Sequence, residues 1–218
     1  MKIEAVVFDL DGVRFDTERL YMDGWCQVAK KRGIRGMEEV AVECIGLNSH
    51  DTRQLVLERF GQDFAYVEFR NAVSAWLKTR IKIYGLPIKP GVHKILTYLQ
   101  QKEIPMGLAS STSYHSVLDH LKVAGIVDYF KVIVAGDMIE HAKPQPDIYF
   151  LTCRKMGVDP ANVIAIEDSP NGIKSAHDAG AKVIMVPDLI TPDEELRKMT
   201  FGICSDLGDV VRFLEQYN

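Results

Sequence analysis

Short, mostly apolar runs recur along the chain and are separated by longer amphipathic stretches. The first run, residues 3–8, reads Ile-Glu-Ala-Val-Val-Phe and is typical of a strand buried on both faces of a parallel sheet. Further strands are predicted at 104–109, 132–135, 163–166 and 182–186, and helices at 92–101, 114–123, 146–156, from Ser169 onward and at 206–217. Strands that alternate with helices predict an α/β fold with a doubly wound, Rossmann-like parallel sheet.

Residues 16–87 depart from this alternation, because helical spacing runs through them without a convincing strand. Four helices are predicted there, at 17–33, 38–44, 52–60 and 64–84. The last one is stopped by Gly85-Leu86-Pro87, a sequence that favours a break in the chain. We therefore predict one discontinuous α/β domain, residues 1–15 and 88–218, with a helical cap, residues 16–87, inserted after the first strand.

Composition and charge exclude several classes of protein. The chain has 218 residues, of which 47% are hydrophobic and 26% charged, as in an ordinary globular protein that buries a sizeable core. A net charge of −4 gives no reason to expect a nucleic-acid partner. No apolar run approaches the roughly 20 residues that span a membrane, and a strand that starts after two residues leaves no room for a signal peptide. The four cysteines are scattered without the close pairs of a zinc site, and we predict reduced thiols in a cytoplasmic protein rather than a disulfide pair.

Two carboxylates, Asp9 and Asp11, follow the first strand in the sequence Asp9-Leu10-Asp11-Gly12. In an open α/β sheet ligands bind at the carboxyl ends of the strands, which is where this pair is expected. Carboxylates so close together repel each other unless a cation or a proton separates them. On this fragment alone a magnesium site with a nucleophilic carboxylate and a solvated Asp-x-Asp-Gly turn are equally good interpretations.

Three further sites follow in the chain, and each has an ordinary structural explanation. Ser110 and Ser111 lie between a strand and a helix, where they can bind phosphate or simply cap the helix. Lys143 stands in a Lys-Pro-Gln-Pro-Asp sequence, and a lone lysine is usually a solvated surface residue. Glu167 and Asp168 end the strand at 163–166 and form either an acidic turn or part of a metal site.

The order of these motifs carries more information than any one of them. The sequence Phe8-Asp9-Leu10-Asp11-Gly12-Val13, followed by Asp16-Thr17-Glu18, resembles the first motif of the haloacid dehalogenase (HAD) superfamily, and the serine, Lys-Pro and Glu-Asp motifs follow in that family's order. More narrowly, the chain resembles the branch of β-phosphoglucomutases and phosphoglycolate phosphatase-like enzymes that carry a helical cap. The resemblance covers essentially the whole chain and implies phosphoryl transfer.

The resemblance also assigns catalytic roles. It implies that Asp9 attacks phosphorus to form a phosphoaspartate and that Asp11 serves as general acid and then as general base. Ser110, the amide of Ser111 and Lys143 would hold the phosphoryl oxygens. Lys143 would also neutralise the nucleophilic carboxylate, a role that suits the compact charge of an ammonium.

A magnesium ion is the implied cofactor. Its expected ligands are the carboxylates of Asp9 and Asp168 and the main-chain carbonyl of Asp11, which leaves room for water and for one phosphoryl oxygen. Glu167 would bind the ion directly or through water. Carbon–halogen hydrolysis needs neither this ion nor an acid at the position of Asp11, so the sequence argues against it. A signalling receiver domain also uses an acidic pair, a hydroxyl residue and a lysine, but it is shorter and lacks a helical insert.

The predicted cap bears on the choice between a phosphatase and a mutase. The mutases resembled here carry an arginine shortly after the match to Gly46 and Leu47, and it binds a second phosphate. This chain has Ser49 and His50 there, and its nearest arginine, Arg53, lies further on. We therefore predict a magnesium-dependent phosphatase for a small phosphomonoester, such as a sugar phosphate or a similar metabolite. Gly46, Leu47 and His50 are the candidate substrate contacts, and a β-phosphoglucomutase-type mutase is the alternative.

Overall fold

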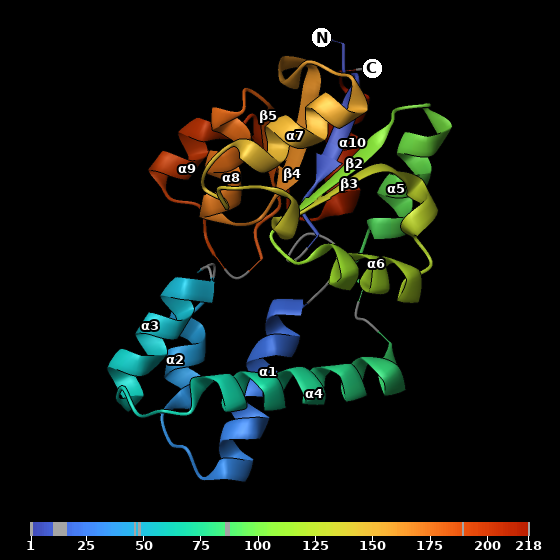
Figure 1. The fold of residues 1–218 in the computed structure, drawn as a ribbon. Helices are drawn as coiled ribbons and strands as arrows, with labels where there is room; N and C mark the ends of the chain where they lie inside the picture. Colours follow the sequence, from blue (N-terminus) through green and yellow to red (C-terminus); the bar gives the residue numbers. More distant parts are fainter. Residues whose placement is uncertain are drawn as a thin grey trace. The chain divides into compact units, whose positions relative to one another are not determined.

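The computed structural model describes residues 2–10, 17–45, 47, 49–85, 88–188 and 190–217. It divides the chain into two compact units. Met1–Phe15 and Pro87–Asn218 form the first, which we call the α/β unit, and Asp16–Leu86 form the second, the helical unit (Figure 1). The prediction that the helical unit works as a cap stays a prediction.

The α/β unit is built on a parallel sheet, as the sequence predicted. Within the described residues the sheet has six strands in the order β3-β2-β1-β4-β5-β6, and every neighbouring pair is parallel. The strands are β1 (Ala5–Phe8), β2 (Met106–Ser110), β3 (Phe130–Ala135), β4 (Val163–Glu167), β5 (Lys182–Met185) and β6 (Gly202–Ile203). The first strand of the chain therefore lies near the middle of the sheet, where Val7 is in register with Gly107 on one side and Ala165 on the other.

Helices cover both faces of this sheet, which explains why its inner strands carry so few polar residues. On one face α7, α8 and α9 pack against side chains such as Ala5 and Val7. On the other face α5 and α10 lie against each other (Figure 1). The helices of this unit are α5 (Val92–Gln101), α6 (Tyr114–Val123), α7 (Asp147–Met156), α8 (Pro170–Asp178), α9 (Glu194–Met199) and α10 (Leu207–Glu215), with short 3₁₀ turns η1 (Val127–Tyr129), η2 (Gly136–Met138) and η3 (Pro160–Asn162).

Helix α8 begins as its sequence predicts. The Ser169 hydroxyl accepts a hydrogen bond from the amide of Gly172, and Pro170 occupies the first turn, where its missing N–H leaves no bond unmade. The sequence analysis did not anticipate α9 and β6. The first is a six-residue helix capped by Asp193, and the second has only two residues, so neither leaves a measurable periodic pattern.

The helical unit contains α1 (Thr17–Arg32), α2 (Met37–Glu43), α3 (Ser49–Phe60) and α4 (Tyr66–Tyr84). Its core is apolar and includes Trp25, whose ring meets Phe69 edge to face at a centroid distance of 5.4 Å. Helix α3 begins at Ser49, three residues earlier than the position 52 expected from the sequence. Gly33 and Gly36 separate the first two helices and both have positive φ angles, which glycine adopts without strain.

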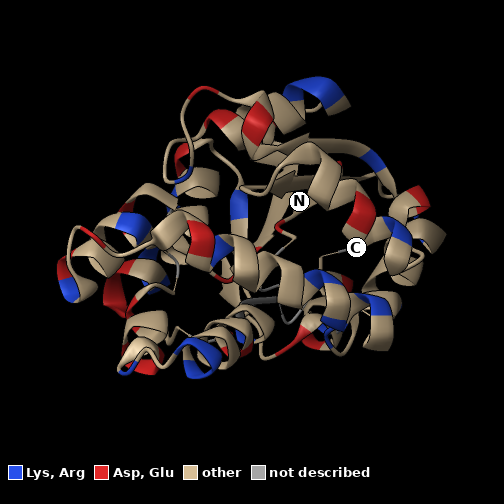
Figure 2. Ribbon diagram, turned by 60° about the horizontal axis from the view of Figure 1, so that its bottom comes forward, with Lys and Arg blue, Asp and Glu red and all other residues tan. Residues whose placement is uncertain are grey.

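Three further observations concern membrane spans, the cysteines and the distribution of charge. Among the described residues, no helix has the length and hydrophobicity that a membrane span requires. The four cysteines, Cys26, Cys44, Cys153 and Cys204, are free. Figure 2 shows basic and acidic residues interspersed along the helices, in keeping with the small net charge of −4.

Candidate active site

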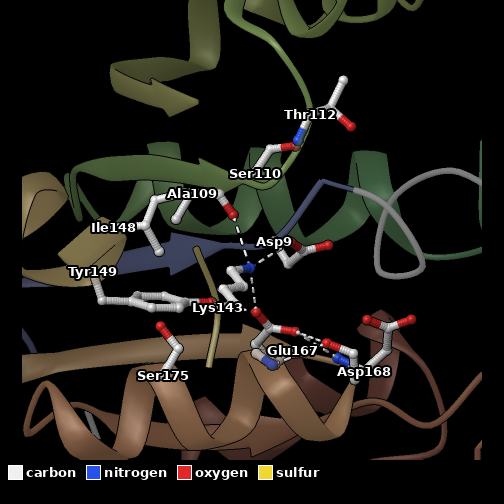
Figure 3. Close-up of polar contacts among 12 residues, drawn as sticks. Asp9, Ala109, Ser110, Thr112, Lys143, Ile148, Tyr149, Glu167, Asp168 and Ser175 are labelled. Carbon is white, nitrogen blue, oxygen red and sulfur yellow. Dashed lines mark hydrogen bonds and ion pairs between the residues drawn. The ribbon is translucent and has the colours of Figure 1, made fainter. Parts of the chain in front are cut away.

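The predicted motifs of the α/β unit meet at the carboxyl edge of the sheet. Asp9 follows β1, Ser110 ends β2, and Glu167 ends β4 with Asp168 next to it. Lys143 arrives from the segment between η2 and α7 and lies among them (Figure 3). All five side chains are at least nine-tenths buried. Residues that are far apart in the sequence thus form one compact polar cluster at the edge where ligands bind in open α/β sheets.

The ammonium group of Lys143 is the centre of this cluster. It donates hydrogen bonds to Asp9 Oδ1 at 2.7 Å, to Glu167 Oε1 at 2.6 Å and to the carbonyl oxygen of Ala109 at 3.2 Å. These three acceptors use all of its three hydrogens. Burial alone would lower the pKa of Lys143, but the negative charges of Asp9 and Glu167 outweigh burial and raise it above its usual value. The lysine is therefore a fixed positive charge.

Glu167 has no exposed surface and is held from several sides. Its Oε1 accepts from Lys143 and, at 2.7 Å, from the hydroxyl of Tyr149. Its Oε2 accepts from the amide of Asp168 at 3.2 Å and from the hydroxyl of Ser169 at 3.3 Å. Burial and, next, the charge of Glu167 raise the pKa of Tyr149 well above its usual value, so the phenol keeps its proton and remains a donor.

Helix α8 approaches this carboxylate very closely. A Cβ atom on Gly172 would overlap the carboxyl carbon and both carboxyl oxygens of Glu167, so only glycine fits there. One turn further on, the buried hydroxyl of Ser175 donates to the carbonyl oxygen of Gln145 at 2.6 Å. This bond ties the segment that carries Lys143 to α8. The same helix therefore positions both the carboxylate and the lysine.

The carboxylates fit a divalent cation. Asp9, Glu167 and Asp168 each offer one oxygen, and these oxygens lie within 4.8 Å of one another. Among the described residues, this buried cluster sets three carboxylates beside the one ammonium of Lys143. Buried carboxylates so close together repel each other unless protons or cations lie between them, and a divalent ion with oxygen ligands would offset that repulsion.

Ser110 lies beside this cluster in a loop of well-defined shape. Its side chain has no exposed surface, and its hydroxyl accepts from the amide of Thr112 at 3.1 Å, whereas Ser111 is exposed. The turn after β3 supports the loop, because Gly136 donates its amide to the Thr112 carbonyl at 3.0 Å. Asp137 then accepts from the amide of Tyr114 at 3.0 Å, where α6 begins.

The remaining predicted site residues are Asp11, Gly46, Leu47 and His50. Asp11 and Gly46 lie outside the described residues. Leu47 and His50 belong to the helical unit, where Leu47 is exposed and His50 Nδ1 lies 3.2 Å from Asp51 Oδ1 in the first turn of α3. Their roles in substrate binding stay predictions.

Three residues around the cluster, Tyr149, Gly172 and Ser175, were not predicted from the sequence. Tyr149 lies two residues after the Lys-Pro-Gln-Pro-Asp sequence, within a helical pattern. An aromatic residue in such a pattern indicates packing in the hydrophobic core and not a polar contact. Gly172 and Ser175 fall in a helical stretch, where a glycine is unusual because it weakens the helix. That glycine was the one available signal of a close approach, but the sequence does not say to what.

Comparison with known proteins places the chain among enzymes of one family. The family model for haloacid dehalogenase-like hydrolases matches residues 6–186. A curated relative from Thermotoga maritima, "Phosphorylated carbohydrates phosphatase", is 32% identical over 84% of each chain. "Beta-phosphoglucomutase" from Bacillus subtilis is 28% identical over 82% of this chain and 80% of its own. The crystal structure of CbbY from Rhodobacter sphaeroides in complex with phosphate is similar with a TM-score of 0.77 and 25% identity, covering 95% of this chain and 96% of that one.

Proposed function

The chain belongs to the haloacid dehalogenase-like hydrolases, and we propose that it is a magnesium-dependent phosphatase that hydrolyses a small phosphomonoester, such as a sugar phosphate. One observation carries the proposal: a buried ammonium is paired with Asp9 at the carboxyl edge of the sheet, beside the clustered carboxylate oxygens of Glu167 and Asp168. This arrangement suits a phosphate group that arrives with a divalent cation. The T. maritima relative named as a phosphatase of phosphorylated carbohydrates supports the same reaction class.

Asp9 is the proposed nucleophile. One of its carboxylate oxygens forms a bond to phosphorus while the bond from phosphorus to the substrate alcohol breaks, which gives a phosphoaspartate and the free alcohol. Water then attacks the same phosphorus and releases inorganic phosphate and the Asp9 carboxylate. The hydrogen bond from Lys143 to Oδ1 fixes the orientation of the nucleophile before substrate binds. Asp11 is predicted to give its proton to the alcohol and to take one from the water.

Two groups are proposed to hold the phosphoryl oxygens. The hydroxyl of Ser110 accepts from the Thr112 amide, and its own proton would be donated to a phosphoryl oxygen. Lys143 acts mainly through its charge, because its three hydrogens already have acceptors. A direct bond from Lys143 to phosphate would replace its longest bond, the one to Ala109 at 3.2 Å.

Magnesium is the proposed cation, and enzymes of this family generally use a divalent metal. When bound, it would offset the repulsion between the nucleophile and the phosphate and stabilise charge on the phosphoryl oxygens. The proposed ligands are the carboxylates of Asp9 and Asp168, the carbonyl of Asp11 and, directly or through water, Glu167. Within Glu167 we assign Oε2 to the cation side, because Oε1 accepts the two short bonds, at 2.6 Å from Lys143 and 2.7 Å from Tyr149, whereas the bonds to Oε2 are longer, at 3.2 and 3.3 Å.

The helical unit is proposed to act as the cap that selects the substrate. Ser49 and His50 begin α3 at the place where the mutases of this branch carry an arginine, and neither offers the paired charged bonds of a guanidinium. Arg53 lies one turn beyond Ser49 and therefore on the same side of the helix, which keeps the mutase as the second candidate.

A substrate panel separates the two activities. The enzyme is assayed with magnesium on a set of small phosphomonoesters, and on β-glucose 1-phosphate with catalytic glucose 1,6-bisphosphate, while free phosphate and glucose 6-phosphate are both followed. We expect phosphate release from several esters without isomerisation. Efficient isomerisation with little free phosphate would establish the mutase instead, and Arg53→Ala, with Arg59→Ala as a control from the same helix, would show whether Arg53 is required for it.

A further inference from the structure

Tyr149 is a buried side chain of the α/β unit whose hydroxyl contacts the polar cluster but has no part in the proposed reaction. It lies in the first turn of α7 with no exposed surface. Its hydroxyl donates to Glu167 Oε1 at 2.7 Å, and its ring centroid is 5.2 Å from Lys143 Nζ (Figure 3). A phenylalanine would fill the same apolar space without a polar atom to satisfy. The hydroxyl is therefore explained by its contact with Glu167 and not by packing.

This contact bears on the nucleophile through a shared acceptor. Glu167 Oε1 receives the phenol at 2.7 Å and the ammonium of Lys143 at 2.6 Å, while the same ammonium reaches Asp9 Oδ1 at 2.7 Å. A second donor on Oε1 weakens the attraction between this oxygen and the Lys143 ammonium. It also occupies one direction from which the ammonium could approach the oxygen. Without the phenol, the ammonium is free to move toward Glu167 and away from Asp9.

We propose that Tyr149 is a positioning residue that acts through Glu167: by donating to Oε1 it keeps the Lys143 ammonium midway between Glu167 and Asp9, and so keeps the nucleophile oriented. The proposal rests on the proposed phosphatase function. It concerns kcat rather than substrate affinity, because the phenol is hidden beneath the lysine and touches no surface that a substrate reaches.

The test compares two losses of a buried hydroxyl from the same helix. Tyr149→Phe removes the bond to Glu167, whereas Thr152→Val removes a fully buried hydroxyl that donates to the Ile148 carbonyl at 2.7 Å, one turn away from the site. With p-nitrophenyl phosphate as the probe, we expect Tyr149→Phe to lower kcat on the order of tenfold with little change in KM, as for the loss of a hydrogen bond to a charged group. Thr152→Val should keep kcat within about twofold. A wild-type kcat in Tyr149→Phe would overturn the proposal.

A double-mutant cycle tests whether the effect passes through Glu167. In a Glu167→Gln background the charge that the phenol modulates is gone, so adding Tyr149→Phe should lower kcat by less than about twofold more. Fully additive losses would show that the Tyr149 hydroxyl acts independently of Glu167 and would overturn the proposed route.

A structural readout keeps this inference separate from the proposed activity. In a crystal structure of Tyr149→Phe, the distance from Lys143 Nζ to Asp9 Oδ1 should exceed the 2.7 Å found here, and the distance to Glu167 should not. An unchanged distance would overturn the positioning role even in an active enzyme. If the wild-type protein hydrolysed no phosphomonoester while this distance still lengthened, the phosphatase proposal would fail and the contact would stand.

Discussion

The two units of this chain bury different kinds of side chain. Among the described residues, every buried carboxylate, ammonium and aliphatic hydroxyl belongs to the α/β unit: Asp9, Ser110, Lys143, Thr152, Glu167, Asp168 and Ser175. The core of the helical unit is apolar, and its bidentate ion pair, Arg59 with Glu43 at 2.6 and 2.7 Å, is exposed. Buried charge is unfavourable unless it is paired or used. The contrast supports the proposal that the chemistry belongs to the α/β unit and that the helical unit selects the substrate.

The strongest test of this contrast removes one carboxylate from each unit. Asp9→Asn should abolish turnover, a loss on the order of 10³-fold or more, because the amide cannot act as the nucleophile. Glu43→Gln removes the partner of Arg59 at the surface and should leave kcat unchanged and the free energy of unfolding within about 1 kcal/mol. Steady-state phosphatase assays and urea unfolding measure both. Normal turnover by the Asp9 variant would mean that the nucleophile lies elsewhere.

Removing the metal tests whether a cation lies among the carboxylates of Asp9, Glu167 and Asp168. Treatment with a chelator should abolish activity and lower the melting temperature, and added Mg²⁺ should restore both, because a ligand that binds the folded state stabilises it. In Asp168→Asn, one of the clustered oxygens is lost, and a higher magnesium concentration should be needed for the same stabilisation. Full activity in the chelated enzyme would contradict the metal assignment.

Replacing one glycine by alanine in each unit compares how tightly the two units are packed. Gly172→Ala should destabilise the protein by about 1–3 kcal/mol and lower kcat, because the new methyl group overlaps a buried carboxylate that cannot move aside. In the helical unit, a Cβ on Gly24 would meet the Trp76 ring at 3.1 Å, where a small shift of the ring relieves the contact. Gly24→Ala also gains helix propensity, so its free energy of unfolding should change by less than about 1 kcal/mol. Equal effects in a urea titration would remove the distinction.

The smallest predicted effect concerns pH. His141 Nδ1 lies 2.9 Å from Asp147 Oδ1, and this hydrogen bond, together with the charge of Asp147, raises the pKa of His141 above its ordinary value of 6.5. Since the folded-state pKa is the higher one, the pair stabilises the protein below pH 6.5 and loses this contribution as the pH rises through the folded-state pKa. The midpoint of urea unfolding should therefore fall slightly over this range in the wild type. His141→Asn should lack this component, and an unchanged pH dependence would assign it to another group.

The sequence predicted what depends on local pattern and chain order. The buried strands can be recognised in the sequence because a parallel strand covered on both faces must be apolar. Asp9, Ser110 and Glu167 can be recognised because each lies at the end of such a strand. Parallel strands bring their ends to one edge, so their proximity follows from the fold class. The donation from Tyr149 and the close approach of Gly172 depend on how α7 and α8 pack in three dimensions, which periodicity does not report. Helix α3 begins early because Ser49 and His50 can adopt helical geometry, although Gly46 nearby suggested a longer break.

The central place of β1 in the sheet has a consequence for how the protein is made. This strand is synthesised first, yet its neighbours β2 and β4 begin only at Met106 and Val163. Until β2 has left the ribosome, β1 has no partner on either edge, and until β4 follows it has a partner on one edge only. The whole helical unit emerges before β2. Pairings over such long separations in sequence form slowly, because loop closure precedes any gain from the contact. Asp9 is thus translated before the rest of the cluster and is among the last of its residues to reach its final surroundings, and a nascent chain released before Glu167 would carry the proposed nucleophile without the site.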